Sequence, residues 1–443
     1  MKILIISYYF PPLNSIGSLR PHSWAKYWSR MGHDVTVLTF KKFNENHNLD
    51  LDNTGFEIVT IESKIFNQLS NFIANKNKLT NKLISDNYIN NKVTSKFSKP
   101  KSLMLNYLRI FKRKTGIFST IRMPDLSDIF IFNINKVSKK LAKYDVCVST
   151  AGPYSVHLIA YRLKLKKHFN YWLADYRDLW TQNSYFGGLF PFTIFEEFLE
   201  RLVNRKAAAI TTVSLPLQKK LEEKYRRNNV FTIENGFDPE DLLKIQGKSK
   251  LWNDHKMRII YTGTIYPSSR DPSPLFIAIK RISKSNCADL LENLEVLFAG
   301  GNTNLEKLIQ KYNVSKYVKY LGYITREKVL LMQRDATILL FLESDDKKFN
   351  GIVTGKLFEY LASGSFIWGI GITSNSTSGK IIEDSNSGKC FGKDINKIQL
   401  ELISLLEGNY LPSQNMKKEI IEKYSREILA KQLLDIIYRI VKN

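Results

Sequence analysis

The chain opens on KILIISYYFPPLNSIGSLRPHSWAKYWSRMGHDVTVLT, residues 2–39, which predicts a strand, a helix and a second strand. Lys2–Ser7 is a continuous apolar run, as expected of a strand buried on both faces of a sheet. Arg20–Met31 carries aromatic side chains at helical spacing, and Gly32 follows as a stop signal. Val35–Thr39 is the next strand. The order strand, helix, strand is typical of a parallel sheet covered by helices.

The same alternation continues in two series of predicted strands. The first series continues at Asp145–Thr150, Tyr171–Ala174, Ala208–Val213 and Phe231–Ile233; the second has Arg258–Tyr261, Leu294–Ala299, Val318–Leu321, Thr337–Leu342, Phe366–Ile370 and Lys389–Phe391. Two series in 443 residues predict two facing, Rossmann-like, doubly wound α/β domains, with ligands bound in the cleft between them.

The expected domains are residues 1–237 and 238–423, and the first contains an insertion at about 67–122. An amphipathic helix at 424–443 is expected to pack back on the first domain.

The composition is that of a globular protein, with 43% hydrophobic and 24% charged residues, and excludes a disordered chain. Three widely separated cysteines predict a reducing compartment, the cytoplasm. The histidines are scattered, so we expect no metal site. The chain has no run of 18 apolar residues and no signal-peptide core near its start, so we expect no membrane-spanning helix.

The charge is strongly positive, with 66 basic and 42 acidic side chains and a formal net charge of +24. Residues 1–237 hold 36 of the basic and 18 of the acidic side chains. Such an excess predicts an anionic partner: nucleic acid, anionic lipid or a phosphorylated substrate.

A basic stretch with interleaved apolar residues lies between 72 and 122. It contains twelve basic residues and one acidic residue, Asp86. Its centre favours a patch that docks on anionic lipid and is released by high salt; the patch comprises Lys101, Arg109, Lys112, Arg113 and Lys114. The alternative is a solvated insertion whose charge only aids solubility.

The densest motif is NGIVTGKLFEYLASG, residues 350–364, which follows a predicted strand and opens a helix. Free N–H groups at Gly355 and Lys356, together with the lysine cation, favour a phosphate group. Glu359 lies one turn further on the same face, where a carboxylate can accept hydrogen bonds from a ribose diol. The motif therefore predicts a nucleotide-diphosphate site, and a Lys356–Glu359 surface pair is the alternative.

Four further residues are candidates from their places after predicted strands. Gly17, in the loop after the first strand, lets the backbone approach a ligand. Gly263 and Arg270 suit a diphosphate clamp, because a guanidinium fork matches phosphate oxygens. Asp178 follows the strand Tyr171–Ala174 and is a candidate base or acceptor-orienting group. The alternatives are loop glycines, a solvated arginine, and an Asp178–Arg177 pair or helix cap.

Taken in order, these motifs resemble those of the retaining GT-B glycosyltransferases of group 1, the family 4 type. The resemblance covers nearly the whole chain and is carried by Tyr9-Phe10-Pro11-Pro12, Gly17, Gly32-His33-Asp34, Asn235-Gly236-Phe237-Asp238, Tyr261-Thr262-Gly263, Ala299-Gly300-Gly301, Leu321-Gly322-Tyr323 and residues 356–364. Within that family the chain looks most like bacterial enzymes of surface-polysaccharide biosynthesis, the amino-sugar transferases among them.

The resemblance implies transfer of a sugar, with an N-acetylated amino sugar as one candidate, from a nucleotide-diphosphate donor, UDP-linked, without metal or other cofactor. It implies a polyprenyl-diphosphate-linked or oligosaccharide acceptor for capsule or O-antigen synthesis, and a peripheral place on the inner face of the cell membrane. The implied donor contacts are Glu359 to ribose, Lys356 and Arg270 to diphosphate, backbone near Tyr323 and Ile324 to the base, and Gly17 for closure over the donor.

This chain departs from that family at Gly351, where many members carry a glutamate that contacts the donor sugar. Glu343, Asp345 and Asp346 are the candidates to replace it. Two other functions stay open. A nucleotide-sugar 2-epimerase shares the expected architecture, and the charge alone suits a nucleic-acid-binding protein. The chain shows no recognisable nucleic-acid-binding module, so no nucleic-acid partner is expected.

Overall fold

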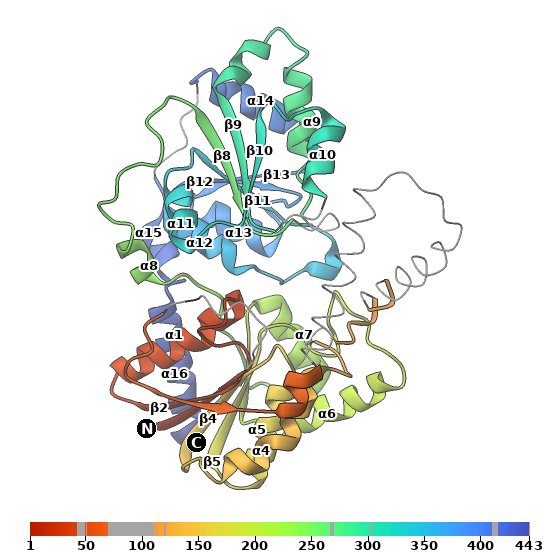
Figure 1. Ribbon diagram of the computed structural model, residues 1–443, viewed down its shortest axis with the longest axis vertical. Helices are drawn as coiled ribbons and strands as arrows, with labels where there is room; N and C mark the ends of the chain where they lie inside the picture. Colours follow the sequence, from red (N-terminus) through yellow and green to blue (C-terminus); the bar gives the residue numbers. More distant parts are fainter. Residues whose placement is uncertain are drawn as a thin grey trace. The chain divides into compact units, whose positions relative to one another are not determined.

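The computed structural model describes residues 1–41, 49, 51–69, 110–112, 114–118, 121–265, 270–301, 304–409 and 415–442, apart from the side chain of residue 347. The chain divides into two compact units (Figure 1). Unit 1 comprises Met1–Ile233 and Ala430–Asn443, and unit 2 comprises Glu234–Leu429. The observed division lies a few residues before the expected one at 237/238.

Unit 1 is built on a parallel sheet that, in the described residues, has seven strands in the order β3-β2-β1-β4-β5-β6-β7. The strands are β1 Lys2–Ser7, β2 Asp34–Phe40, β3 Glu57–Ile61, β4 Tyr144–Thr150, β5 Phe169–Tyr176, β6 Ala209–Thr212 and β7 Val230–Thr232. Helices α1 Ile16–Arg30, α4 Ile129–Ser138, α5 Ser155–Leu165, α6 Phe192–Lys206 and α7 Leu215–Tyr225 accompany it.

Two details of unit 1 differ from the sequence-based expectation. The edge strand β3 was not predicted, because of its five residues only Ile61 is buried and no apolar run marks it. Helix α1 starts at Ile16, ahead of the predicted Arg20, because Ser15 caps it by accepting a hydrogen bond from the Gly17 N–H at 3.2 Å.

Unit 2 is built on a second parallel sheet, whose described part has six strands in the order β10-β9-β8-β11-β12-β13. The strands are β8 Met257–Thr262, β9 Leu294–Ala299, β10 Val318–Gly322, β11 Ile338–Leu342, β12 Phe366–Ile370 and β13 Gly388–Gly392. Its helices are α8 Pro239–Leu243, α9 Ser273–Ile282, α10 Leu305–Tyr312, α11 Arg326–Arg334, α12 Gly355–Ser363, α13 Thr377–Asp384, α14 Ile395–Leu406 and α15 Lys418–Glu422. Each sheet buries its own apolar core, as continuous apolar strands require.

The last helix, α16 Arg426–Lys442, begins in unit 2, and its residues from Ala430 onward belong to unit 1. The indole N–H of Trp28 in α1 donates to the carbonyl of Ala430 at 2.8 Å. Leu433 and Ile437 are fully buried. The amphipathic pattern of this helix is therefore satisfied by packing against unit 1.

An ion pair fixes the carboxyl edge of the unit 1 sheet. The fully buried Asp175, in β5, accepts from Arg20 Nη2 at 2.8 Å and from the hydroxyls of Thr150 and Thr211 at 2.7 and 2.8 Å. Arg20 also donates to the carbonyl of Ile233 at 2.9 Å. Burial disfavours the Asp175 carboxylate, but Arg20 and the two hydroxyls hold its pKa below the usual value. The pair thereby joins α1 to β4, β5, β6 and the end of unit 1.

We predict that Asp175→Ala destabilises the protein by about 3–5 kcal/mol, because it leaves the Arg20 guanidinium buried without its counter-charge. Urea unfolding measures the change. Asp178→Ala is the control three residues along, at an exposed side chain, and should change stability by no more than about 0.5 kcal/mol. Equal stabilities of the two variants would contradict the structural role of the pair.

Candidate functional site

The candidate site lies in unit 2, where helix α12 begins beside the end of strand β8. Thr354 makes no side-chain cap hydrogen bond to the first turn of α12, so the N–H groups there lack the usual cap. The Lys356 ammonium lies 3.7 Å from the centre of the Tyr261 ring. Burial of the ammonium, and then the nearby Arg270 charge, lower the pKa of Lys356 well below its usual value. An anion bound here would offset both unfavourable effects.

Glycines make room for this lysine and for the close approach of two loops. A Cβ atom on Gly263 would stand 2.6 Å from Lys356 Nζ, and the φ of Gly263 is +130°, a value that favours glycine. Gly300, directly after β9, has a φ of +125°. A Cβ atom there would lie 2.6 Å from the Gly263 carbonyl oxygen, because the two loops pack backbone against backbone. These glycines therefore let the loops after β8 and β9 pack against Lys356 and against each other at the carboxyl edge of the sheet.

Arg270, Tyr323 and Ile324 come from loops on the same edge of this sheet. The half-buried Arg270 donates to the Thr264 carbonyl at 3.2 Å, two residues after the β8 strand ends. Tyr323, just after β10, is 85% exposed, and a Cβ on Gly301 would lie 3.0 Å from its hydroxyl oxygen. Ile324 is half-buried against the core beneath α12. The edge thus carries a cation and an exposed aromatic ring.

Glu359 has a partner that the sequence motif did not indicate. Its carboxylate oxygen Oε1 accepts from Arg326 Nη1 and Nη2, each at 3.2 Å, and Arg326 also donates to Asp241 at 2.6 Å. Burial opposes the charge on Arg326, yet the carboxylates of Glu359 and Asp241 raise its pKa. The ion pair of Glu359 is therefore with Arg326, and not with Lys356 as the alternative supposed. Arg326 lies 33 residues away in sequence, so no local spacing could have revealed it.

Glu343 has a raised pKa and a buried carboxylate oxygen without a partner in the described part of the chain. Ser378 donates to its Oε2 at 2.6 Å, and its Oε1 is buried without a hydrogen-bond partner among the described residues. Burial raises the pKa of Glu343 to about 7, against the opposing charges of Arg270 and Lys356. It lines a cavity of about 420 Å³ whose wall includes Asp345, Asp346, Asn350, Gly351, Thr373 and Ser376. Among the three candidates to replace the glutamate missing at Gly351, Glu343 alone combines burial with an unsatisfied oxygen.

In unit 1, Gly17 and Asp178 both follow strands at the carboxyl edge of the sheet, and Arg177, the neighbour of Asp178, packs against Gly17. Gly17 packs tightly, because a Cβ there would lie 2.7 Å from Arg177 Nη1 and 3.1 Å from the Tyr9 ring. Asp178 follows β5 and is exposed, and within the described chain its carboxylate has no hydrogen bond or ion pair. Of the expected lipid patch, Lys112 and Lys114 are exposed; Lys101, Arg109 and Arg113 lie outside the described residues.

The described residues hold neither a candidate metal centre nor a candidate membrane span. No group of three or more histidine, cysteine, aspartate or glutamate side chains in that part of the chain is arranged to hold a metal ion. None of the described helices combines the length and the apolar character needed to cross a bilayer.

Comparison with solved structures finds the same fold over the whole chain. Sucrose-phosphate synthase from Thermosynechococcus elongatus gives a TM-score of 0.64 at 11% identity, covering 100% of this chain and 99% of that one. The lipopolysaccharide outer core galactosyltransferase WaaB gives 0.56 at 11% identity and 99% of both chains. The UDP-GlcNAc 2-epimerase from Methanocaldococcus jannaschii gives 0.53 at 12% identity, covering 99% and 100%. No protein-family model matches the sequence, and no curated protein matches it.

The structure therefore has the GT-B fold, with two Rossmann-like units that each carry a parallel sheet and flanking helices. At these identities the likeness shows the fold alone. The fold confirms the predicted class, and the candidate site occupies the carboxyl edge of the second sheet, where ligands of such sheets bind.

Glu343 makes stability depend on pH in a predictable direction. Because its pKa in the folded protein lies above its unfolded value, the folded state holds the proton more tightly, and stability falls as pH rises from about 4.5 to about 7. Glu343→Gln, which cannot ionise, should raise the melting temperature relative to wild type at pH 8 and not at pH 4.5. Thermal unfolding at both pH values measures this; an equal change at both would contradict the assigned protonation.

Proposed function

We propose that this protein is a retaining glycosyltransferase that moves a sugar from a UDP-linked donor, with N-acetylated amino sugars as candidates, to a lipid-linked or oligosaccharide acceptor in surface-polysaccharide synthesis. The observation that carries the proposal is the Lys356 ammonium, held between Gly263 and the Tyr261 ring at the uncapped start of α12. A cation and a helix start without a side-chain cap together form a receptor for diphosphate.

The donor contacts follow from this position. Lys356 and Arg270 neutralise the diphosphate, and the first turn of α12 at Gly355 adds N–H donors. Glu359, oriented by Arg326, binds the ribose diol, and the loop at Tyr323 and Ile324 holds the base. In the transfer step, negative charge develops on the leaving diphosphate, and Lys356 with Arg270 stabilises that charge without a metal ion.

Carboxylates serve the transferring sugar and the acceptor. Glu343 takes the place of the glutamate absent at Gly351 and accepts a hydrogen bond from a sugar hydroxyl through its unsatisfied Oε1. Asp178, exposed at the end of β5, orients the acceptor hydroxyl. The exposed Lys112 and Lys114 support a peripheral position on the cytoplasmic membrane face, where a polyprenyl-diphosphate acceptor would be held.

The test is a donor-turnover assay with a panel of nucleotide sugars in excess EDTA. Release of UDP from one donor, stimulated by an acceptor extract, and an NMR-determined anomeric configuration equal to that of the donor are expected. Activity that disappears in EDTA and returns with Mg²⁺ would contradict the metal-free mechanism. Inversion of the anomeric configuration would contradict retention.

We predict that Glu359→Ala reduces the donor kcat/KM at least tenfold, about 1.4 kcal/mol, with the protein still folded. Asp241→Asn is the matched control, because it removes the other acidic partner of Arg326 and leaves Glu359 in place. Steady-state kinetics at subsaturating donor give both values. If the two variants lose equal activity, Glu359 acts only through Arg326 and does not bind the ribose.

We predict that Asp178→Asn lowers kcat at least tenfold while donor affinity stays within about twofold, because its partner is the acceptor hydroxyl. Its melting temperature should match wild type, since the side chain is exposed and packs into no core. Turnover and donor binding are measured separately. A variant with wild-type kcat would remove Asp178 from the mechanism.

A nucleotide-sugar 2-epimerase is the second candidate, favoured by the fold shared with such an enzyme. It needs no acceptor, which separates the two functions. Incubation with UDP-GlcNAc alone and NMR of the sugar would give the C2 epimer if the chain is an epimerase, and unchanged or hydrolysed donor if it is a transferase.

A further inference from the structure

Helix α6 of unit 1 has its polar and apolar faces inverted relative to an ordinary surface helix. The outward side chains Ile194, Phe195 and Phe198 are 61%, 58% and 65% exposed, and Phe190, just before the helix, is 76% exposed. The inward face carries two carboxylates: its buried residues are Glu196, Glu200, Val203 and Asn204, and Leu199 packs against the core. Large apolar residues grouped on an exposed face are uncommon, and they mark surfaces that bind something.

Buried hydrogen bonds hold the helix in this orientation. Glu196 accepts from the Met123 N–H at 2.9 Å and the Trp180 indole at 3.1 Å, and it lies 3.1 Å from Arg122 Nη2. Glu200 forms an ion pair with Lys224 at 3.2 Å. Rotating α6 to bury its phenylalanines would break these contacts and leave the buried Arg122 guanidinium without its counter-charge. These contacts therefore hold the aromatic face outward.

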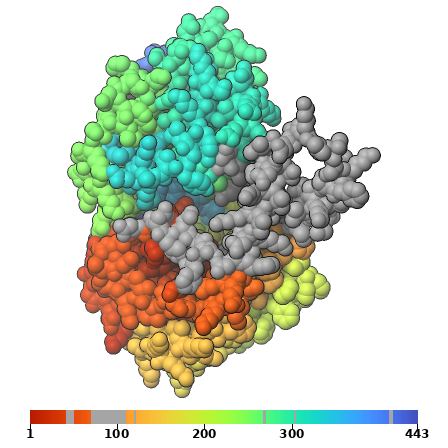
Figure 2. Space-filling view, viewed as in Figure 1, coloured from red at the N-terminus to blue at the C-terminus, as the bar shows by residue number. Residues whose placement is uncertain are grey.

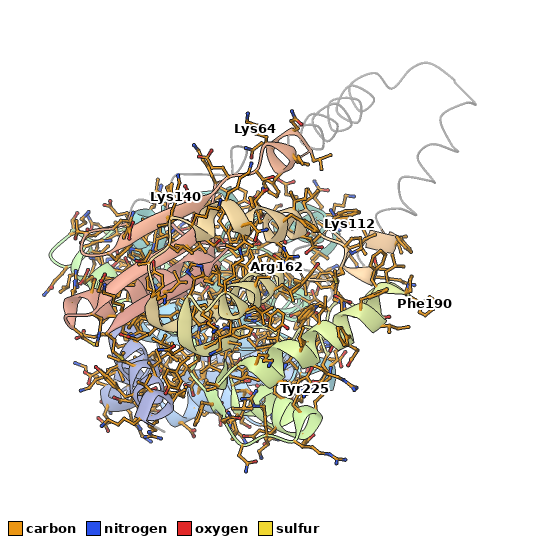
Figure 3. The ribbon with its side chains drawn as sticks, turned by 90° about the horizontal axis from the view of Figure 1, so that it is seen from below. Lys64, Lys112, Lys140, Arg162, Phe190 and Tyr225 are labelled. Atoms are coloured by element: carbon orange, nitrogen blue, oxygen red, sulfur yellow. The ribbon has the colours of Figure 1, made fainter. Side chains whose placement is uncertain are left out.

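A basic segment lies against the start of α6 and extends the same surface. The Gly187 N–H donates to the Lys114 carbonyl at 3.1 Å, and the Gly188 N–H donates to the Thr115 carbonyl at 3.0 Å. In Figure 2 the yellow-green atoms of this region stand at the side of the unit, and Figure 3 shows Lys112 and Phe190 on the same side of unit 1. The exposed residues that this segment adds are Ile110, Phe111, Lys112, Lys114 and Phe118.

The charges around this aromatic surface are positive. At the far end of α6, Arg201, Arg205 and Lys206 are exposed. Glu197, an acid on the same helix, is paired with Lys224 at 3.0 Å and with Arg201 at 3.9 Å. A second copy of this chain would bring a like-charged rim against this one, which disfavours self-association. An anionic bilayer matches both parts, because phenylalanine side chains partition into the acyl boundary and lysine or arginine heads stay with the phosphates.

We propose that the surface formed by Phe190, Ile194, Phe195 and Phe198, rimmed by Lys112, Lys114 and Arg201, docks into an anionic lipid bilayer with the aromatic side chains inserted. This proposal names the surface that would make the membrane contact of the proposed function. It rests on that function only in assuming that the acceptor is held at the membrane. The cations steer the approach and are screened by salt, whereas inserted apolar side chains keep binding when salt is raised. Binding with both components distinguishes this surface from a purely electrostatic patch.

The test is flotation with vesicles of phosphatidylcholine alone or with about 30% phosphatidylglycerol, in about 0.15 M and about 1 M NaCl. Wild type should bind the anionic vesicles at both salt concentrations and bind neutral vesicles weakly. The triple variant Phe190→Ser, Phe195→Ser, Phe198→Ser should lose at least tenfold in affinity at low salt and all binding at high salt. Lys112→Gln with Lys114→Gln should weaken low-salt binding and leave the salt-resistant part.

Leu400→Ser is the matched control, because Leu400 is 69% exposed on α14 of unit 2 and belongs to no such surface. It should bind vesicles as wild type does. The single variant Phe195→Trp provides a readout independent of folding of the triple variant: the fluorescence of the introduced indole should shift to the blue on anionic vesicles and be quenched by brominated lipid.

Wild-type vesicle binding by the triple variant, or an unquenched indole signal from the Phe195→Trp variant, would overturn the proposal. If wild type is a dimer in solution and the triple variant is a monomer, the surface serves self-association, and the proposal is equally overturned. UDP-sugar turnover is measured without lipid on the same samples. Lipid docking without turnover would leave this surface standing and contradict the proposed function, and turnover without docking would do the reverse.

Discussion

The account of unit 2 depends on one contact, the Lys356 ammonium against the Tyr261 ring. A lysine enclosed between an aromatic ring, a glycine and an uncapped helix start loses much of its hydration, which lowers its pKa and leaves the charged form in need of a counter-ion. The neighbouring carboxylates Glu359 and Glu343 raise that pKa only in part, because Glu359 is also paired with Arg326 and burial raises the pKa of Glu343 to about 7. The site is therefore electrostatically prepared for an anion, and the positive φ of Gly263 is the backbone feature that makes room for the lysine.

Unit 1 uses buried ionic groups for a different purpose. Asp175 is fully satisfied by Arg20 and two threonines, so it organises the edge of the sheet and has no capacity left for a ligand. Glu196 and Glu200 likewise turn inward and fix the orientation of α6. In both cases the buried carboxylates are structural, whereas their neighbours, Asp178 and the α6 phenylalanines, are exposed.

The sequence predicted the fold well, because continuous apolar runs such as Lys2–Ser7 and Leu294–Ala299 can only be strands buried on both faces of a parallel sheet. It missed β3, whose side chains are mostly exposed and carry no apolar run. At the candidate site, Lys356, Gly263 and Arg270 were chosen from local spacing and stay predictions, whereas the contact of Arg326 with Glu359 and the burial of Glu343 arise between distant segments. The inverted face of α6 was not foreseeable either, since phenylalanines at helical spacing ordinarily predict a buried side.

The most direct measurement of the central claim is calorimetric titration of UDP in excess EDTA, carried out in buffers of different ionisation enthalpy. Because the lowered pKa of Lys356 must rise when a diphosphate binds beside it, wild type should bind UDP with net uptake of protons at pH 8. Lys356→Met, which keeps the apolar stem, should bind at least tenfold more weakly and without that uptake, while Lys389→Met, at an exposed lysine paired with Glu401, should behave as wild type. UDP binding of equal affinity in wild type and Lys356→Met would contradict the account.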